Sequence, residues 1–416
     1  MNAATLAAPV PRDAALSSQA PRSREAILAG LPALAAAIAQ GAAEREARRE
    51  LPFDAFARVR ASGLGALRIA REQGGPGGSV EDVIGAVATL AAADSNVAHA
   101  LRSHFNTTEL LRLGPATAQN RRQIQQVLDG ALFGGAFTEL GTARAGISTS
   151  TLTREGAHYR LNGRKYYATG TAYADYAGVY AVDEDGAGLV AVVPVDREGV
   201  RVLDDWDGMG QRLTASGGLE LDNVQVFADE VAPAARDQVP GRHASALRQL
   251  ILVATAAGIV RNIASDAVHY VREHARPAMH SPADTAREDP FVQSVVGELA
   301  ATSHAIDALV AENARVLDQG AQAILRGAAD AQAAVLQGAL ATAKTQLVVS
   351  RLALAAAERL FEVGGASATA RRHNLDRHWR NLRTIFSHNP LLHKARVVGD
   401  YELNGTTRHL EEGRVF

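Results

Sequence analysis

The strongest constraint on the fold is that one segment with strand patterning lies between two long segments with helical patterning. Before residue 132, apolar residues such as Ile27, Leu31 and Leu34 recur every three or four positions, which is the spacing of one face of a helix. Residues 132–230 instead contain runs of strand-forming residues separated by Gly, Asp and Asn. Over residues 244–396 the helical pattern returns with a strong bias to alanine. The chain must therefore place one β module between two helical parts.

Short polar and glycine-containing segments divide the β module into strands. The pair Asn162-Gly163 is flanked by strand-forming residues, and such a pair predicts a two-residue type I′ hairpin turn. Two further strands are expected over Gly188–Val195 and Gly218–Phe227. The whole segment therefore reads as an all-β module.

The length of 416 residues suggests two or three domains. We expect a fold that is mainly α with a central all-β domain. The predicted parts are a flexible N-terminus (1–24), an N-terminal helical domain (25–131), the β domain (132–235), a C-terminal helical bundle (236–400) and a C-terminal tail (401–416).

Local signals mark individual helix ends. Ser79 follows a glycine-rich loop and precedes Asp82 by three residues, so we expect Ser79 to cap the next helix. Pro277, Pro282 and Pro290 indicate one long loop between two later helices. The alanine-rich helices around that loop allow close packing within a subunit and between subunits.

Composition excludes several classes of function. The chain has 43 Lys and Arg against 45 Asp and Glu, a formal net charge of −2, so it lacks the basic field that a nucleic acid or an acidic membrane would require. It has no cysteine, which excludes disulfides and thiolate chemistry. The longest apolar run, Leu250–Val260, is shorter than the ~20 residues of a membrane span. The opening stretch Met1–Arg22 lacks a sustained apolar region, so we expect a cytoplasmic protein without membrane or nucleic-acid partners.

A set of motifs then occurs in one order along residues 25–400. They are Gly63-Leu64, Gln73-Gly-Gly-Pro-Gly-Gly-Ser79, Leu90-Ala-Ala-Ala-Asp94, Phe137-Thr138-Glu139, Asn162-Gly-x-Lys165-x-Tyr167-x-Thr169-Gly170, Phe361-Glu-Val-Gly364-Gly365 and Leu375-Asp-Arg-x-x-Arg380-x-x-Arg383. In this order they resemble the acyl-CoA dehydrogenase superfamily. The resemblance implies a helical domain, a β-barrel or β-sandwich domain and a C-terminal four-helix bundle, with a flavin between the β domain and the bundle.

The catalytic carboxylate of the dehydrogenases in this superfamily has no counterpart here. A dehydrogenase needs a base to remove the proton opposite the hydride that leaves for the flavin. In the superfamily that base lies shortly after the basic helix or on the first helix of the bundle. Neither Thr384–Gly399 nor Gly241–Arg261 contains any Asp or Glu, which argues against dehydrogenation.

The motifs Trp206-Asp-Gly-Met-Gly-Gln211 and Ser387-His388-Asn389-Pro390 instead resemble flavin-dependent monooxygenases related to dibenzothiophene monooxygenase and the bacterial sulfur-acquisition oxidoreductases. The resemblance implies a two-component enzyme that takes reduced FMN from a separate NAD(P)H-dependent flavin reductase. With dioxygen, such an enzyme oxygenates a small organosulfur compound, or an amine, through a flavin C4a-hydroperoxide. A homotetramer is the family expectation.

The resemblance also assigns roles to single residues. It places His104 and His388 at the reactive edge of the flavin and Thr169 near the flavin N5, and these three are the predicted catalytic residues. The predicted cofactor-binding residues are Phe137, Thr138, Thr169, Trp206, Arg276, Arg372 and His388. Arg276 suits a phosphate because a guanidinium binds it in a bidentate manner. Trp206 stacks against the cofactor, lines the pocket or is only a packing residue.

Other interpretations remain open. An enzyme with tightly bound FAD, similar to an acyl-CoA dehydrogenase, is the principal alternative, and a flavin-free assembly protein that kept only the fold is a third. A metal site is not expected, because His373 and His378 lie about 140° apart around a helix and no Glu-x-x-His motif falls in a segment with helical patterning.

Overall fold

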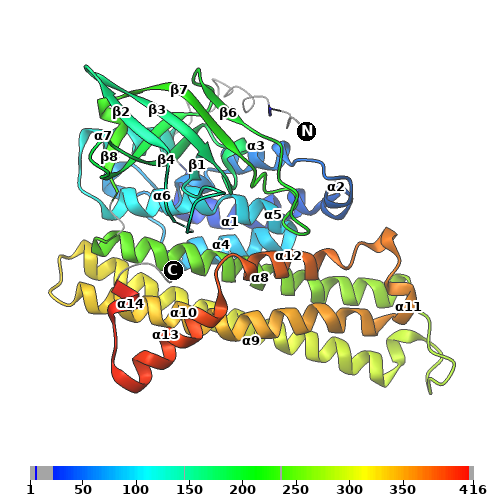
Figure 1. The fold of residues 1–416 in the computed structure, drawn as a ribbon. Coiled ribbons are helices and arrows are strands. Elements are labelled where there is room, and N and C mark those ends of the chain that lie inside the picture. Colours follow the sequence, from blue (N-terminus) through cyan, green and yellow to red (C-terminus); the bar gives the residue numbers. More distant parts are fainter. Residues whose placement is uncertain (1–4, 7–21, 145, 235–236, 412–416) are drawn as a thin grey trace.

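The computed structural model describes residues 5–6, 22–144, 146–234 and 237–411. Its β domain lies on one side of a layer of helices and its long bundle on the other (Figure 1). The helical, β, helical order confirms the predicted fold class. Most of the predicted flexible N-terminus and the end of the predicted tail lie outside the described residues.

Short helices precede the β domain. They are α1 (Arg24–Ala39), α2 (Ala42–Arg48), α3 (Phe53–Ser62), α4 (Val80–Ala93), α5 (Ser95–Ala100), α6 (Arg102–Leu113) and α7 (Ala118–Leu128). The predicted cap of α4 is confirmed: Ser79 Oγ accepts from Asp82 N at 3.0 Å and Asp82 Oδ2 accepts from Ser79 N at 2.7 Å. This reciprocal pair is a capping box, which satisfies two backbone donors at the helix start.

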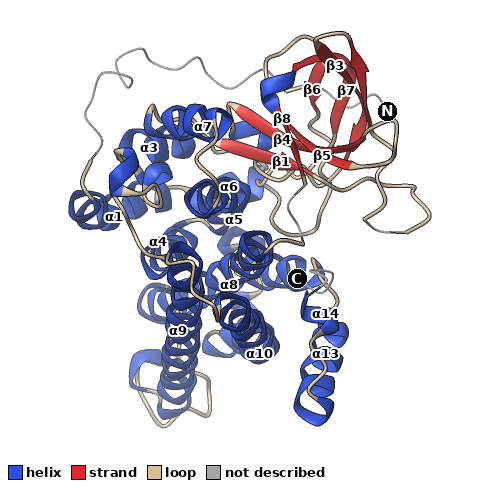
Figure 2. Ribbon diagram, turned by 90° about the vertical axis from the view of Figure 1, so that its left-hand side faces the viewer, coloured by secondary structure: helices blue, strands red, loops and turns tan. Residues whose placement is uncertain are grey.

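The β domain is one mixed sheet. Its strands are β1 (Phe133–Ala136), β2 (Thr151–Glu155), β3 (His158–Lys165), β4 (Tyr176–Val182), β5 (Gly188–Pro194), β6 (Val200–Val202), β7 (Leu219–Phe227) and β8 (Val231–Pro233). The order is β6-β7-β3-β2-β4-β5-β8, and β1 pairs in parallel with β4. This arrangement brings the end of β1 beside α6 (Figure 2).

The predicted hairpin turn at Asn162-Gly163 is wrong. Strand β3 runs through both residues, and its register with β7 shifts between Leu161 and Gly163, which marks a bulge. A Cβ at Gly163 would lie 2.1 Å from Ser150 Oγ, so the glycine is required by close approach of a neighbouring segment. The turn between β2 and β3 instead falls at Gly156, which has a φ of +62°.

The bundle after the β domain is built on three long helices. Its helices are α8 (Val239–Glu273), α9 (Pro290–Leu325), α10 (Ala331–Arg359), α11 (Gly365–Ala368), α12 (Arg377–Ser387), α13 (Leu391–Asn404) and α14 (Arg408–Glu411). Helices α8, α9 and α10 pack on one another, while α12 lies on α8 and α10 and α13 lies on α10. The loop between α8 and α9 contains Pro277 and Pro282 and ends where Pro290 starts α9, as predicted.

Helix α8 joins the bundle to the N-terminal helices. It packs against α4, and a Cβ at Gly258 would lie 2.4 Å from both the Ala88 carbonyl oxygen and the Ala91 side chain. Such close contact between helices requires a glycine at that position. Helix α8 is long and apolar enough to resemble a membrane span, but 67% of its most apolar window is buried inside the protein, as in the core helix of a folded domain.

Candidate flavin and oxygenation site

Four segments meet where the β domain faces the helices. They are the turn after β3, the junction of α5 with α6, the loop before β7 and the C-terminal end of α12. Gly170 in the turn has a φ of +77°, and a Cβ there would lie 2.1 Å from the Ala100 carbonyl oxygen. The neighbouring Thr169 is therefore fixed beside the last turn of α5, which carries His99.

His99 is a buried histidine with one free ring nitrogen. Its Nδ1 lies 3.1 Å from Gln211 Oε1, and Gln211 Nε2 donates to Ser95 Oγ at 3.0 Å. Since the side-chain nitrogen of Gln211 binds Ser95, its side-chain oxygen faces His99. His99 Nδ1 therefore carries the hydrogen, and His99 Nε2 carries the lone pair. Nε2 is buried and has no partner among the described residues. Burial, and then the charge of Arg102, lowers the pKa of His99 to about 3.

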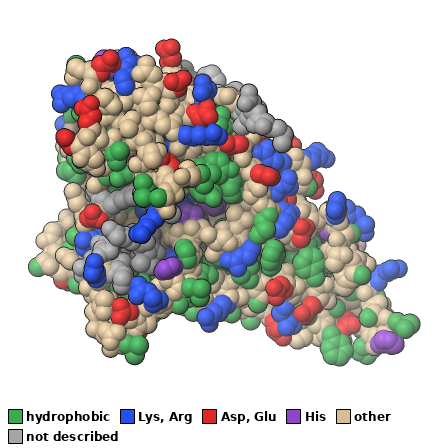
Figure 3. Space-filling model, viewed as in Figure 1, with side chains coloured by type: hydrophobic (Ala, Val, Ile, Leu, Met, Phe, Trp, Pro, Cys, Tyr) green, Lys and Arg blue, Asp and Glu red, His purple; other side chains and the backbone are tan. Residues whose placement is uncertain are grey.

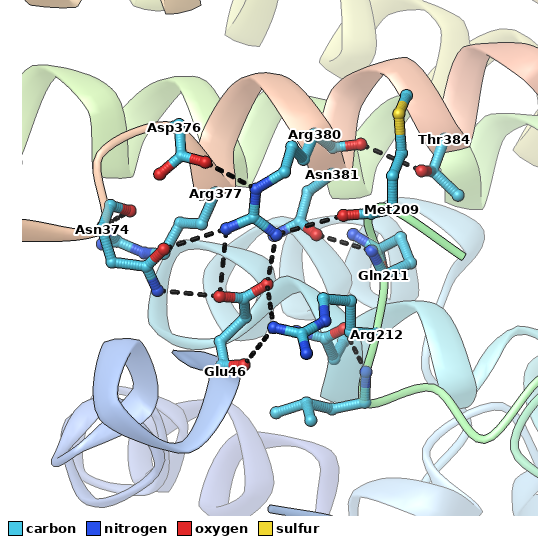
Figure 4. Close-up of polar contacts among 12 residues, drawn as sticks. Glu46, Met209, Gln211, Arg212, Asn374, Asp376, Arg377, Arg380, Asn381 and Thr384 are labelled. Atoms are coloured by element: carbon cyan, nitrogen blue, oxygen red, sulfur yellow. Dashed lines mark hydrogen bonds and ion pairs between the residues drawn. The ribbon is translucent and has the colours of Figure 1, made fainter. Parts of the chain in front are cut away.

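A polar network fixes Gln211 in place (Figure 4). Asn381 Oδ1 accepts from the Gln211 backbone N–H at 2.6 Å, and Arg380 Nη1 donates to the Met209 carbonyl at 3.1 Å. Arg380 also binds the buried Glu46 at 2.6 Å. Gln211 itself has a φ of +51°, an uncommon conformation for a residue with a side chain, and such strain is frequent at functional sites. The network therefore connects α2, α12 and the loop that orients His99.

His388 lies at the C-terminal cap of α12, close to His99. Its Nδ1 lies 3.0 Å from Asn389 Oδ1, which leaves Nε2 as the free acceptor. The ring is exposed to solvent, yet it lies deep among protein atoms, and this desolvation lowers its pKa well below 6.5, with Arg102 and His99 adding to the effect. Both facts fit a residue in a hollow, and Figure 3 shows histidine atoms in the hollow between the β domain and the helices beneath it.

Thr169 offers one donor and one acceptor. Thr214 Oγ1 donates to the Gln211 carbonyl at 2.8 Å, so Ser216 Oγ donates to Thr214 Oγ1 at 2.6 Å and Thr169 Oγ1 donates to Ser216 Oγ at 2.7 Å. The Thr169 hydroxyl proton is therefore used, and its lone pairs remain. Its backbone N–H has no hydrogen-bond partner among the described residues. Towards any further group the hydroxyl is therefore an acceptor.

His104 occupies a different position from the one expected. Its Nε2 donates to the Gly65 carbonyl at 2.8 Å, and its Nδ1 accepts from the Phe133 N–H at 3.2 Å. Both ring nitrogens are thus bound to backbone groups, and the side chain is 1% exposed. Burial lowers its pKa to about 4. His104 joins α6 to β1 and has no nitrogen left for a cofactor.

The sequence reasoning missed His99. It lies five residues before His104, a separation of about 140° around a continuous helix, so only one of the two could face the β domain. The chain breaks at Leu101 between α5 and α6, and this break is what turns His99 toward the site. The sequence signal for a new helix starting before His99 was Asp94, a favourable N-cap residue. In the structure Asp94 caps α5 by accepting a hydrogen bond from Asn96 N at 3.0 Å.

The predicted β-domain residues lie at this site with different roles. Phe137 and Thr138 follow β1, and a Cβ at Gly135 would contact both the Phe137 ring and Ser103 of α6, at 3.0 and 3.1 Å. Trp206 donates through Nε1 to the Gln211 carbonyl at 2.8 Å, and its ring packs against Gly208. The contacts of Trp206 are therefore those of a residue that shapes the Gln211 loop.

The predicted phosphate ligand Arg276 and the predicted cofactor-binding residue Arg372 lie far from these residues in the same chain. Arg276 follows the C-terminal end of α8, and Arg372 precedes His373, whose ring lies 5.0 Å from that of His274. Arg248, which acts on the pKa of His388, lies 25 residues earlier in α8 than the end of the helix, or about 38 Å along its axis. One protomer therefore does not bring Arg276 and His388 together.

Comparison with known proteins identifies the family. The family models described as "Acyl-CoA dehydrogenase, C-terminal domain" and "Acyl-CoA dehydrogenase, middle domain" match residues 250–391 and 136–224. Over 365 residues the chain is 30% identical to dibenzothiophene monooxygenase from Mycolicibacterium goodii, covering 83% of this chain and 86% of that protein. The chain belongs to the acyl-CoA dehydrogenase superfamily.

Several of the most similar proteins within this superfamily are named as monooxygenases. The probable FMNH2-dependent monooxygenase SfnC of Pseudomonas putida is 32% identical over 379 residues, covering 89% of this chain and 93% of SfnC. FMN-bound TdsC from Paenibacillus sp. A11-2 superposes with a TM-score of 0.83 at 30% identity, covering 91% of this chain and 98% of TdsC. The methanesulfinate monooxygenase MsuC from Pseudomonas fluorescens superposes with a TM-score of 0.82 at 29% identity, covering 91% and 97%. These relatives confirm the predicted membership of the flavin monooxygenase subgroup.

Proposed function

We propose that this protein is a reduced-FMN-dependent monooxygenase that oxygenates a small organosulfur compound. It uses dioxygen and receives reduced FMN from a separate NAD(P)H-dependent flavin reductase. The sulfur substrate is supported by the relatives, which include a dibenzothiophene monooxygenase and a methanesulfinate monooxygenase. Reduced FMN would supply the two electrons that activate dioxygen.

The observation that carries this proposal is a set of polar atoms without partners, on which no carboxylate among the described residues acts. His99 Nε2 and the Thr169 N–H have no partners among the described residues. The charged groups that act on His99 and His388 are themselves basic. A flavin edge with its carbonyls and ring nitrogens fits these donors and acceptors. An acyl-CoA dehydrogenase with FAD would require the missing base.

Each residue then has a specific task. Thr169 would hold one edge of the flavin ring, with Oγ1 as an acceptor and the backbone N–H as a donor. His99 and His388 are uncharged at neutral pH, because their pKa values are lowered. Their Nε2 atoms would therefore accept hydrogen bonds at the reacting oxygen without placing a negative charge there.

We also propose that a second protomer binds the flavin phosphate. Arg276 and Arg372 gather at the far end of α8, about 38 Å along the axis from the turn of Arg248. We infer that these arginines bind the FMN phosphate of a neighbouring copy, so that each complete site is shared between protomers. A homotetramer in the cytoplasm is the assembly that we propose.

A reconstituted assay tests the function. The purified protein is mixed with a flavin reductase, NADH, FMN and air, and the oxygenation of a sulfide, a sulfone and a sulfinate is followed by mass spectrometry. We expect oxygenated product with the wild type, and a loss of at least about 100-fold in His99→Ala and His388→Ala. His158→Ala, in the outer hairpin where His158 binds only Glu155, is the matched control and stays near wild-type activity.

Two outcomes would reject the monooxygenase proposal. If the protein purifies with tightly bound FAD and reduces an electron acceptor with an acyl-CoA thioester in the absence of a reductase, the monooxygenase proposal is wrong. If it binds neither FMN nor FAD, the chain has kept only the fold.

A further inference from the structure

Helix α13 has one buried side and one exposed apolar side. Its inner side packs on α10, where Lys394 and Val397 are buried. In Figure 2 the helix lies at the outer edge of the bundle, on the side of α10 that faces away from α9. On its outer side, Leu392 and Leu403 are each 85% exposed. A contiguous apolar surface of this kind marks a site of interaction.

Four residues form this surface, which we call the α13 stripe: Leu392, Ala395, Gly399 and Leu403. At about 100° per residue, they fall within about 80° of one another around the helix. Ala395 is exposed, and a Cβ placed on Gly399 would meet nothing within 4 Å among the described residues. The stripe is therefore an unpartnered helix face with a large residue at each end and small residues between them.

The order of residues in the α13 stripe complements itself. If two copies of α13 pack antiparallel about a two-fold axis near position 397, Leu392 faces Leu403 of the partner subunit. Ala395 then faces Gly399 of the partner subunit, because the two pairs share almost the same centre. Small residues in the middle allow the two backbones to approach closely. Such a contact uses the same surface on both copies, as two-fold dimers do.

The charged residues beside the α13 stripe fit the same arrangement. Arg396 and Asp400 lie on one flank of the stripe. The antiparallel pairing would place Arg396 opposite Asp400 of the partner subunit, and flanking charges of this kind set the orientation of paired helices. A membrane surface would instead favour a basic rim, which the carboxylates of Asp400 and Glu402 do not provide. The flanking charges therefore favour a second copy of the helix.

We propose that the α13 stripe is a docking surface for a second copy of this chain, with the two α13 helices packed antiparallel across a two-fold axis. The contact also bears on the candidate site, since only Asn389 and Pro390 separate His388 from the start of α13. A docked α13 holds this segment at both ends, through α12 on one side and through the partner on the other. Self-association through α13 does not depend on which substrate the protein oxygenates.

Disulfide cross-linking of the whole protein tests the pairing. The chain has no cysteine, so only introduced thiols can react. In Leu392→Cys/Leu403→Cys we expect mild oxidation to convert most of the protein to a covalent dimer on a non-reducing gel. Each single variant should stay monomeric on the gel, because identical positions would lie about 16 Å apart along the axis, beyond the reach of a disulfide. The matched control His393→Cys/Asn404→Cys has the same spacing on another exposed side of α13 and should give no dimer.

Analytical ultracentrifugation over a range of protein concentrations provides a second test. Leu392→Asp/Leu403→Asp should weaken self-association at least about tenfold, because the contact buries both leucines. Circular dichroism should show an unchanged fold, since both side chains are exposed in the protomer. The control His393→Asp should assemble like the wild type.

Four results would refute antiparallel pairing of α13. They are dimerisation of a single-cysteine variant as readily as of the double variant, failure of the double-cysteine variant to cross-link, and assembly of the aspartate variant like the wild type. The fourth is a monomeric wild type whose binding to phosphatidylglycerol vesicles is lost in the aspartate variant, because the stripe would then serve a membrane surface.

Discussion

If His104 stabilises the fold and His99 acts at the reaction site, the variant His104→Asn should lose stability by a predictable amount and keep its activity. Asparagine keeps an acceptor near the Phe133 N–H but is too short to reach the Gly65 carbonyl, which His104 binds at 2.8 Å. An unsatisfied buried carbonyl, together with the lost ring, costs about 2–4 kcal/mol. We therefore expect the free energy of unfolding at pH 7.5 to fall by that amount.

The same variant should behave differently in acid. The pKa of His104 is about 4 in the folded protein against about 6.5 in the unfolded chain. Below pH 6.5 the unfolded state binds a proton that the folded state does not, so wild-type stability falls from pH 6.5 down to about pH 4. At pH 5 this linkage costs about 2 kcal/mol. His104→Asn lacks it, so the stability gap to wild type should shrink by about 2 kcal/mol between pH 7.5 and pH 5.

Urea denaturation at fixed protein concentration measures the gap at both pH values. His99 and His378, with pKa values lowered to about 3 and about 4, also destabilise the protein in acid, but they are common to both proteins and cancel in the difference. Oxygenation at saturating FMN should stay within severalfold of wild type at pH 7.5. A gap that is the same at both pH values, or a folded variant without activity, would refute the structural role of His104.

Three further predictions concern packing, positioning and charge. Gly170→Ala should weaken FMN binding and destabilise the protein, because the new methyl group would lie 2.1 Å from the Ala100 carbonyl oxygen. The control is Gly85→Ala, in an exposed part of α4 where a Cβ has no neighbour within 4 Å. Thermal denaturation should show that this control stabilises the protein by about 0.5–1 kcal/mol. Gln211→Leu removes the acceptor of the His99 Nδ1–H and should lower kcat about 10- to 100-fold with little change in KM for the sulfur substrate; an unchanged kcat would contradict the positioning role. Glu109→Gln leaves Arg68, which is 1% exposed, without its counter-charge and should cost about 3–5 kcal/mol of stability in urea denaturation, whereas a loss below 1 kcal/mol would contradict this.

The general architecture could be predicted from the sequence because it depends on periodicity. Helical spacing before residue 132, strand patterning after it and the proline-marked loop at 274–289 all correspond to elements of the structure. The order of motifs then indicated the family, and the missing carboxylate indicated the type of chemistry. These signals are local in sequence, so they can be recognised without knowing how the helices and strands pack.

The errors arose where tertiary contacts override local preference. Asn162-Gly163 has the composition of a tight turn, but pairing of β3 with β7 extends the strand and makes the pair a bulge. His99 and His104 lie five residues apart, and the chain breaks between them at Leu101; His104 is the one whose ring binds backbone groups. A local pattern does not contain either piece of information.

The site residues show the same limit. Thr169 and His388 could be proposed from motifs, but the direction of the Thr169 hydroxyl depends on Ser216, which lies 47 residues further along the chain, and on Thr214 beside it.

The network at Arg380 has a consequence for how such an enzyme can be divided or recombined. Its guanidinium binds Glu46, Met209 and Asp376, which come from the first, second and third parts of the chain. The loop that orients His99 is thus correctly shaped only when all three parts are present and docked. An isolated domain would therefore be inactive. A hybrid made by exchanging the β domain between relatives would be active only if it kept these contacts of Arg380.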